Sequence, residues 1–427
     1  MPASVPPPPP AYVEPVPPPG AILPTSGAAH RLRVALLMAG SCLPILGAVL
    51  IAPVLPKMQD HFADVPGAGA LVPMALTVPA LALGLLAPFA GVIVDRLGRK
   101  RLLIAATVLY SIFGTAPLWL ESLGAIVASR ALVGVAEAAI MTCCTTLIGD
   151  YYSGRVRDRY LALQTMCASA SATAFFVIGG AAGSVGWRAP FWIYAVSLLI
   201  APLMAIGLPK PTAATGAAAE DGDGESTDTT VVPKRSFPFR QLAGICGLTV
   251  FGALVFYTVP VEMSYLLDDL GVTATSVIGL ATAIASAATV AGAITFAKLR
   301  GAPGPRLPLV FALCSAGFAV MWLANSAPLL IAGAVLNCLG TGLLLPSLLT
   351  IAMSRLDFAD RGRGTGLWTA SFFIGQFICP LALIAAESAL GTLASAVGLL
   401  GLTSAVVAAG LFLTARRRAA AVAPLPQ

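Results

Sequence analysis

Two side chains of opposite charge stand in an otherwise apolar run of the sequence, residues 123–148. Arg130 and Glu137 are seven residues apart, so on an α-helix they share one face, about 10 Å apart along the axis. This spacing suits two groups that serve one water-filled cavity better than a direct ion pair. A carboxylate in such a cavity can bind and release a proton, as a proton-coupled cycle requires. The alternative is a structural role, in which a protonated Glu137 is hydrogen-bonded to helix backbone.

Other polar side chains in apolar runs are candidates for the lining of the same cavity. For each of them, a hydrogen bond that holds neighbouring helices together is at least as good an explanation. Glu262 and Glu387 stand near the predicted outer ends of their runs, where solvation at the membrane interface explains them. The candidates for the cavity are Gln164, Asn337, Trp368 and Gln376.

The composition indicates the environment in which these side chains are held. Of 427 residues, 58% are hydrophobic and 10% are charged, and the mean hydropathy is +0.89. A soluble protein has about 25% charged residues, so a solvated globular enzyme is excluded. Disorder of the whole chain is excluded because apolar residues are abundant, and an outer-membrane barrel would need alternating polar residues. We therefore expect an all-α polytopic membrane protein.

No cofactor or metal site is expected. None of the eight Cys residues belongs to a C-x-x-C motif, and the chain has only two His residues, so buried free thiols are the preferred interpretation. The basic residues are spread over many short loops, which argues against a nucleic-acid partner. No P-loop occurs, so ATP is not indicated.

Apolar runs long enough to cross a bilayer recur from Leu32 onward. A membrane helix needs about 20 residues to cross about 30 Å of hydrocarbon. Twelve runs meet this criterion and predict twelve membrane-spanning helices. The runs are 32–54, 70–94, 102–120, 123–148, 160–184, 187–208, 242–264, 274–297, 307–324, 327–352, 365–386 and 391–414.

The basic residues predict the orientation of these helices. With the N-terminus in the cytoplasm, all but three of the 25 Lys and Arg residues fall in cytoplasmic segments. The exceptions are Lys57 and Arg188 in outer loops and Arg130 within a span. We therefore expect a multi-pass protein of the inner (cytoplasmic) membrane with both termini in the cytoplasm.

A long acid-rich segment, residues 209–240, separates the first six spans from the last six. Its polarity predicts a flexible cytoplasmic linker between two pseudo-symmetric six-helix bundles. Arg157 and Arg159 before span 5 recur as Arg361 and Arg363 before span 11, which agrees with a repeat. The expected parts are a disordered Pro-rich cytoplasmic tail (1–30), an N-terminal bundle (31–208), the linker (209–240), a C-terminal bundle (241–415) and a cytoplasmic tail (416–427).

The loop between spans 2 and 3 reads GVIVDRLGRKR, residues 91–101. A glycine at 91 lets two helices approach closely, Asp95 can face the positive N-terminal end of a neighbouring helix, and a glycine at 98 permits a tight turn. A basic loop that only sets topology, with a chance acidic residue, is the alternative. The loop resembles the G-x-x-x-D-R-x-G-R-[RK] signature of the major facilitator superfamily, in the place where that family has it. The matching residues are Gly91, Asp95, Arg96, Gly98, Arg99 and Lys100.

Two partial motifs resemble the same family. Arg130 followed by Gly134 resembles its second pattern, in which an intramembrane Arg precedes a Gly by four residues. Residues 179–191 resemble the junction of spans 5 and 6 in drug-exporting members, but Ser171 and Phe175-Phe176 replace the Gly and the Gly-Pro bend usual there. Close helix packing is the preferred explanation for the glycines at 179, 180 and 183.

The resemblance implies two bundles that open a central cavity to either side of the membrane in turn. In the family, the 91–101 loop stabilises the closed cytoplasmic side. The drug:proton antiporter branch is the most similar in character, which implies export of a small amphipathic organic compound or drug by a monomer. Glu137 and Arg130 would then couple export to protons. The implied partners are the substrate, protons and the lipid bilayer.

Other functions remain open from the sequence. An importer or facilitator of an organic anion or nutrient would have the same fold, with Arg130 as counter-ion. A membrane enzyme would need His, Asp or Ser residues clustered at one membrane face, and the sequence has no such cluster. A non-transporting sensor usually carries a soluble signalling domain, and the polar segments here are too short to fold as one.

Overall fold

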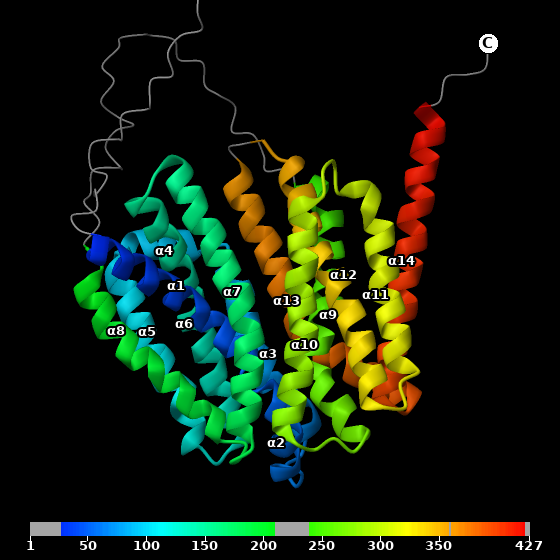
Figure 1. Ribbon diagram of the computed structural model, residues 1–427, viewed down its shortest axis with the longest axis horizontal. Helices are drawn as coiled ribbons and strands as arrows, with labels where there is room; N and C mark the ends of the chain where they lie inside the picture. Colours follow the sequence, from blue (N-terminus) through cyan, green and yellow to red (C-terminus); the bar gives the residue numbers. More distant parts are fainter. Residues whose placement is uncertain (1–26, 210–238, 358–359, 423–427) are drawn as a thin grey trace, which may run out of the picture.

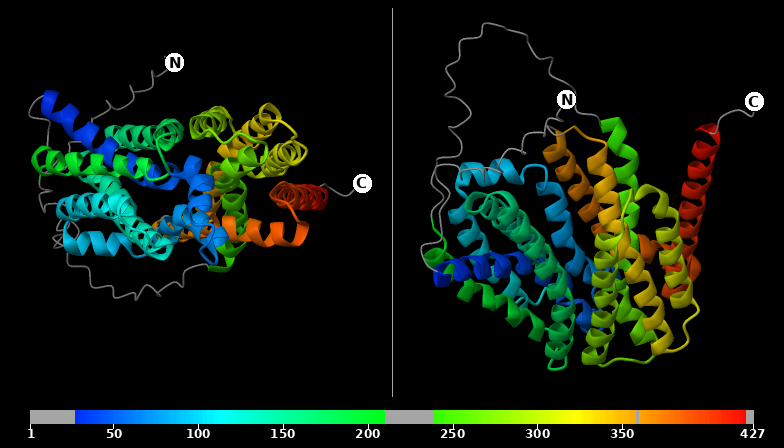
Figure 2. Two further views of the ribbon diagram at one scale, coloured as in Figure 1. Left: turned by 90° about the horizontal axis from the view of Figure 1, so that it is seen from below. Right: turned by 45° about the horizontal axis from the view of Figure 1, so that its top comes forward.

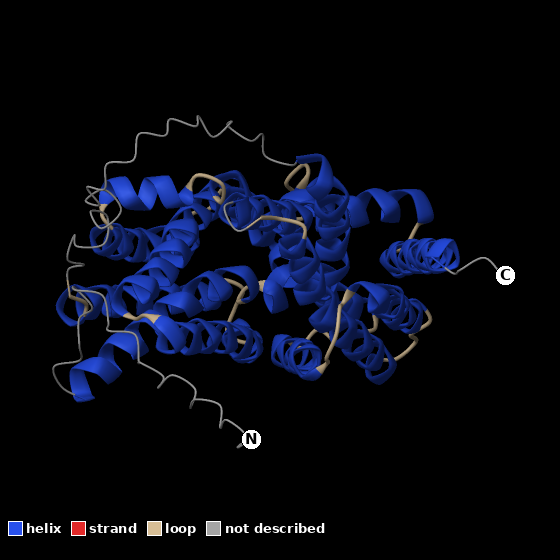
Figure 3. Cartoon of the chain, turned by 90° about the horizontal axis from the view of Figure 1, so that it is seen from above, coloured by secondary structure: helices blue, strands red, loops and turns tan. Residues whose placement is uncertain are grey.

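The computed structural model describes residues 27–209, 239–357 and 360–422. In these ranges the secondary structure is helical, without a strand (Figure 3). Twelve helical segments are long and apolar enough to cross a membrane. The prediction of an all-α protein with twelve membrane-spanning helices is therefore confirmed. Most of the predicted N-terminal tail and linker, and the last five residues, lie outside the described ranges.

The N-terminal half contains spans that are broken into shorter elements. Its elements are α1 (Gly27–Val49), η1 (Ala52–Val54), α2 (Leu55–His61), α3 (Ala68–Leu86), α4 (Ala90–Leu97), α5 (Arg99–Thr115), η2 (Ala116–Leu118), α6 (Leu123–Tyr151), α7 (Gly154–Gly183), η3 (Ala189–Ala195) and α8 (Val196–Gly207).

Prolines account for two of these breaks. The predicted span 70–94 is not continuous: α3 ends at Leu86, and α4 begins after Pro88. Similarly, α1 ends at Val49, and η1 continues the chain around Pro53. A proline has no N–H group to donate to the carbonyl four residues earlier, so a helix tends to end or bend just before it. The hydropathy of the sequence predicts one continuous span at such places, because the segments on both sides of the proline are apolar.

The C-terminal half has longer and less interrupted helices. Pro260, Pro346 and Pro380 lie inside helices that continue through them. In a membrane, neighbouring helices supply partners for the backbone groups that a proline frees. The elements are α9 (Phe239–Asp269), α10 (Thr275–Lys298), η4 (Gly304–Arg306), α11 (Leu307–Trp322), α12 (Ala327–Ser354), α13 (Arg361–Leu390) and α14 (Leu393–Val422).

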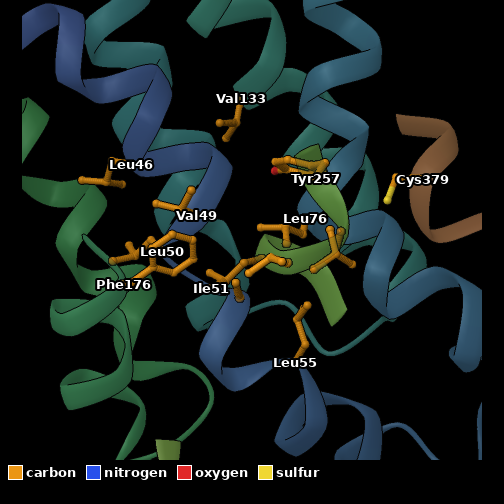
Figure 4. Close-up of a cluster of buried hydrophobic side chains, with 14 of the residues drawn as sticks. Leu46, Val49, Leu50, Ile51, Leu55, Leu76, Val133, Phe176, Tyr257 and Cys379 are labelled. Atoms are coloured by element: carbon orange, nitrogen blue, oxygen red, sulfur yellow. The ribbon is translucent and has the colours of Figure 1, made fainter. Parts of the chain in front are cut away.

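The two halves lie side by side, with the N-terminal helices (blue to green) next to the C-terminal helices (green to red) in Figures 1 and 2. Between them, α7 packs against α10 and α3 packs against α13. One cluster of buried apolar side chains extends across both halves (Figure 4): Leu50 and Phe176 belong to it from the first half, and Tyr257 and Cys379 from the second. We call the end of the molecule that carries residues 209 and 239 the linker end.

Glycines allow the close approach of α7 to α10 at the end opposite the linker. A Cβ atom on Gly180 would lie 2.5 Å from the Thr275 carbonyl oxygen and 2.9 Å from the Gly279 Cα atom. A Cβ atom on Gly279 would in turn collide with the Phe176 carbonyl oxygen. Both obstacles are backbone atoms, which cannot rotate away. The interpretation of Gly179, Gly180 and Gly183 as close-packing residues is confirmed, since Cβ atoms at 179 and 183 would also clash.

Substituting Gly180→Ala should therefore destabilise the protein, by about 1–3 kcal/mol, the usual cost of overpacking. Gly244 on α9 is the matched control, because a Cβ atom there meets nothing within 4 Å. Gly244→Ala should be neutral or stabilising, since alanine is the better helix former. Thermal unfolding of the two purified variants in detergent measures the difference. Equal melting temperatures would contradict the proposed contact.

Candidate functional site

A cavity of about 290 Å³ lies between the two halves. This is close to the lower limit of the about 300–1,000 Å³ usual for small-molecule sites. Its walls come from α1, α3, α6 and α7 of the first half and from α9, α10, α12 and α13 of the second. Most of the lining side chains are apolar. A site built from both halves changes shape whenever the halves move against each other.

The cavity lies toward the linker end of the α7–α10 interface. The two helices touch where Gly183 meets Thr275 and where Thr173 donates a hydrogen bond of 3.1 Å to Ser286. The residues of the two helices that line the cavity extend from Phe176 and Thr282, which lie between these contacts, to Thr165 on α7 and Ala293 on α10. The interface is thus tight at one end and hollow toward the other.

Glu137 on α6 is the one Asp, Glu, Lys, Arg or His residue among the described residues that line this cavity. Its side chain is fully buried. Neither carboxylate oxygen has a hydrogen-bond partner in the described part of the chain. The carboxylate lies over Gly47 of α1, in the place that a Cβ atom at 47 would occupy. A glycine at this position is therefore what admits the acidic side chain.

Arg130 is also fully buried, but it lies behind the cavity wall and does not line the cavity. Its Nη2 donates to the Gly47 carbonyl oxygen at 2.9 Å, and its Nε donates to the Ala75 carbonyl oxygen at 3.2 Å. The guanidinium carbon lies 4.9 Å from the centre of the Tyr194 ring, close enough for a cation–π interaction. Gly47 therefore contacts both charged side chains, the guanidinium through its carbonyl oxygen and the carboxylate through its Cα face.

The end of α1 explains why Arg130 lies here. The Leu50 N–H donates to the Leu46 carbonyl oxygen, whereas the next two carbonyl oxygens, of Gly47 and Ala48, accept from side chains. The last carbonyls of a helix have no partner within it and carry a partial negative charge, which a cation stabilises. Arg130 donates a hydrogen bond to one of these carbonyl oxygens, that of Gly47. The Tyr257 hydroxyl of α9, in the other half, donates to the second at 2.6 Å.

Aromatic residues of the second half form a wall of the cavity. Phe256 and Tyr257 come from α9, and Phe372 and Phe373 come from α13. The Phe256 and Phe372 ring centres are 5.8 Å apart, and those of Phe372 and Phe373 are 5.3 Å apart. Sequence analysis did not single out these residues, because an aromatic side chain in an apolar helix gives no sign of which way it faces.

The four residues predicted to line the cavity are distributed differently. Gln376 lines it. Gln164 instead donates to the Ser41 hydroxyl at 2.8 Å, and so links α7 to α1. Asn337 is fully buried between α12 and α11, where its Nδ2 donates to the Cys314 carbonyl oxygen at 3.4 Å. Trp368 stacks on Phe372, with ring centres 5.8 Å apart, and so backs the aromatic wall.

The interface explanation for Glu262 is wrong, because this side chain is only 4% exposed. It lies on α9, with Glu387 of α13 close enough to repel its negative charge, but it does not line the cavity. Among the described residues, no group of three or more His, Cys, Asp or Glu side chains could hold a metal ion.

The 91–101 loop joins α4 to α5 at the linker end. Gly98 has a φ of 82°, a backbone conformation that favours glycine, and so makes the tight turn. Arg99 forms an ion pair with Asp150 near the end of α6, and the Lys100 Nζ donates to the Ala205 carbonyl oxygen of α8 at 2.7 Å. Asp150, which sequence analysis missed, is thus the partner that ties the loop to α6.

Two other residues of the motif, Gly91 and Arg96, contribute less to this packing. A Cβ atom at Gly91 would meet nothing within 4 Å, so the expected close approach of two helices at this glycine is wrong. Arg96 is exposed, and the backbone of Asp95 is part of α4. Gly134 does permit close packing, because a Cβ atom there would lie 2.5 Å from the Pro79 backbone of α3.

A family model described as Major Facilitator Superfamily matches residues 37–265 and 245–427. The tetracycline resistance protein, class C, of Escherichia coli is 32% identical over 159 residues, 36% of this chain and 39% of that protein. Protein spinster homolog 3 of Danio rerio is 28% identical over 243 residues, 53% of this chain and 47% of that protein. The 3-(3-hydroxy-phenyl)propionate transporter of E. coli K12 is 26% identical over 171 residues, 40% of each chain. The chain thus matches about half or less of the length of these relatives.

Two solved structures have the same fold. A bacterial homologue of the human lysosomal transporter Spinster, in an inward-facing and occupied conformation, has a TM-score of 0.69 at 17% identity, covering 92% of this chain and 98% of that one. A D-xylose–proton symporter has a TM-score of 0.72 at 14% identity, covering 90% and 97%. At such low identities the likeness is one of fold.

The contact between Gly47 and Glu137 can be measured with a double-mutant cycle. Gly47→Ala should destabilise the protein that carries Glu137, because the new methyl group displaces a buried carboxylate. In a Glu137→Ala background the same change should cost less, and the coupling should fall within about 0.5–3 kcal/mol, the usual range for residues in contact. Unfolding of the four proteins in detergent gives the value. Additive effects of the two substitutions would contradict this geometry.

Proposed function

The chain belongs to the major facilitator superfamily, and we propose that it exports a small amphipathic organic compound or drug across the inner membrane in exchange for protons. Members of this family are membrane transporters and not enzymes, so the chain is a multi-pass transporter of a small molecule. The direction of transport, the coupling to protons and the kind of substrate belong to our proposal.

The proposal depends on one observation: Glu137 belongs to the cavity wall, is fully buried, and has no hydrogen-bond partner for its carboxylate oxygens among the described residues. A buried carboxylate without a hydrogen bond is costly to keep ionised even with Arg130 nearby, so Glu137 is a group that can bind a proton. Proton binding and release at Glu137 would therefore accompany each filling and emptying of the cavity. This is the coupling that a proton antiporter needs.

The packing of the halves supports alternating access. Toward the linker end, α3 and α13 are in contact, since a Cβ atom on Gly84 would lie 3.3 Å from the Ala370 carbonyl oxygen. The α7–α10 contacts close the cavity at the end opposite the linker. For the cavity to open the other way, these contacts would separate and the linker end would close. The Arg99–Asp150 ion pair keeps the 91–101 loop fixed to α6 during such a movement, so the loop moves with the first half.

Import of an organic anion is the second candidate, and the position of Arg130 argues against it. The relatives include a transporter of 3-(3-hydroxy-phenyl)propionate as well as a tetracycline resistance protein, so they favour neither direction. An anion would need a positive group in the cavity. Arg130, expected to supply it, is instead engaged with two carbonyl oxygens behind the wall. When ionised, Glu137 in the cavity wall would repel an anion.

We also propose that the protein works as a monomer, with both termini in the cytoplasm. One chain supplies every wall of the cavity, so no second copy is needed to complete it. The distribution of Lys and Arg residues supports the orientation, because positively charged loops stay on the cytoplasmic side.

Glu137→Gln should abolish substrate movement driven by a pH gradient in proteoliposomes, because an amide cannot carry the proton. Downhill substrate exchange should persist, since the cavity keeps its shape. Glu262→Gln is the matched control: it makes the same chemical change at a buried carboxylate that does not line the cavity. Gradient-driven transport at the wild-type rate in Glu137→Gln would remove this residue from the mechanism.

The orientation can be tested with single cysteine substitutions at two exposed positions. Arg300 lies between α10 and α11 at the linker end, and Glu121 lies between α5 and α6 at the opposite end. A membrane-impermeant maleimide added to intact cells should label Glu121→Cys, and should label Arg300→Cys only after permeabilisation. The reverse pattern would place the termini outside.

A further inference from the structure

We propose that the exported compound is an aromatic molecule of a few fused rings with carbonyl or hydroxyl oxygens, and that the Gln376 amide and the Ser169 and Ser286 hydroxyls bind these oxygens. The inference rests on the proposed function and adds the chemical class of the substrate and the residues that select it. Three features of the cavity carry it: an amide without a partner, hydroxyl groups along one seam, and a group of aromatic rings.

The Gln376 side chain of α13 lines the cavity and is only 5% exposed. Its amide forms no hydrogen bond within the described part of the chain. An amide has two N–H donors and one acceptor oxygen, and leaving these groups buried without a partner is costly. A compound that offers an oxygen to this amide as it fills the cavity therefore binds better than one that does not.

Hydroxyl groups line the cavity along the seam between α7 and α10. These helices run in opposite directions, because Phe176 lies against Gly279 and Thr173 lies against Ser286. Ser169 stands one turn before Thr173 on α7, so it is the next residue of this face to approach α10 beyond Ser286. Both serines line the cavity. They thus occupy adjoining positions where the seam widens into it.

The two serine hydroxyls each keep a proton that they can donate. Ser286 accepts a hydrogen bond from Thr173 and donates none to the residues that the structure describes, and Ser169 makes no hydrogen bond with them. Thr282 differs, since its hydroxyl donates to the Ile278 carbonyl oxygen at 2.9 Å. A hydroxyl group has one proton and two lone pairs. An oxygen of a ligand could therefore accept from either serine.

The rings of such a ligand would have partners on α9 and α13. The Phe256 and Phe372 ring centres lie 5.8 Å apart, those of Phe372 and Phe373 lie 5.3 Å apart, and all three residues line the cavity. Aromatic groups pack on one another in offset or edge-to-face arrangements. Gln376 follows Phe372 by four residues, so the amide and this ring share one face of α13. One molecule can pack its rings there and offer an oxygen to the amide.

The lining argues against two other classes of compound. A sugar or an amino acid would bury many polar groups among side chains that are mostly apolar. A hydrocarbon would take the place of water at Gln376 and the serines without replacing the hydrogen bonds of water, which lowers affinity. The volume of about 290 Å³ suits a molecule of about three fused rings.

Two fluorescent compounds of nearly the same shape test the need for an oxygen. N-methylacridone carries a carbonyl oxygen where dimethylanthracene carries a methyl group, and both are uncharged. Binding to the purified protein in detergent is measured by fluorescence polarisation. The ratio of the two affinities is compared between wild type and variants, because this comparison cancels the different partition of the compounds into detergent.

Gln376→Leu should lower the affinity for N-methylacridone roughly tenfold relative to dimethylanthracene, as for the loss of a buried hydrogen bond. Dimethylanthracene should still bind, which shows that the cavity is folded. Gln376→Asn keeps an amide on a shorter side chain and should retain part of the preference. Ser169→Ala should lower the same ratio by a smaller factor, and it removes no hydrogen bond to the described residues.

Gln164→Leu is the matched control. It makes the same chemical change on α7, where the amide donates to the Ser41 hydroxyl and lies outside the cavity lining. Its affinity ratio should equal that of the wild type. An unchanged ratio in Gln376→Leu, or an equal loss in Gln164→Leu, would overturn the inference.

Failure of this inference can be distinguished from failure of the proposed function. If dimethylanthracene drives proton movement in proteoliposomes as well as N-methylacridone does, in wild type and in Gln376→Leu, proton antiport stands and the oxygen requirement fails. If N-methylacridone binds with the expected dependence on Gln376 and a pH gradient does not move it, the oxygen requirement stands and antiport fails.

Discussion

The end of α1 beside the cavity is the constraint on which the rest of the site depends. Pro53 cannot donate a hydrogen bond, and the carbonyl oxygens of Gly47 and Ala48 turn to side chains from other helices. A membrane interior offers few alternative partners, so these carbonyls must be satisfied within the protein. Arg130 and Tyr257 do so, one from each half of the molecule. The end of α1 therefore determines where the buried guanidinium of Arg130 lies.

The position of Arg130 in turn defines the role open to Glu137. Because the guanidinium is directed to the backbone, it does not neutralise the carboxylate through a hydrogen bond. The two charges lie on either side of Gly47, near enough to interact and separated by one residue without a side chain. This arrangement lowers the cost of a buried carboxylate while it leaves both carboxylate oxygens without a hydrogen-bond partner among the described residues. A direct ion pair would have closed the site.

Glycines make this architecture possible at several levels. Gly47 admits the carboxylate, Gly134 brings α6 against α3, and Gly180 with Gly279 brings the two halves together. In lipid there is little hydrophobic gain from helix association, so close backbone packing supplies much of the attraction. The same contacts that stabilise the closed end are narrow and involve few side chains. They can therefore separate without leaving large unpaired polar groups.

Much of this architecture is predictable from the sequence, and the limits have physical causes. The number of spans, the helical class and the family follow from hydrophobicity and from the 91–101 motif, because long apolar runs in a membrane can only be helices or barrels. The enclosure of Arg130 and Glu137 within the protein also follows, since charges in apolar runs are costly. The sequence does not say which way a side chain faces when every face of its helix is apolar. Only the tertiary structure decides that Glu137 belongs to the cavity wall, that Arg130 and Asn337 do not, and that four aromatic residues of the second half line the cavity, because these facts depend on how the helices rotate as they pack.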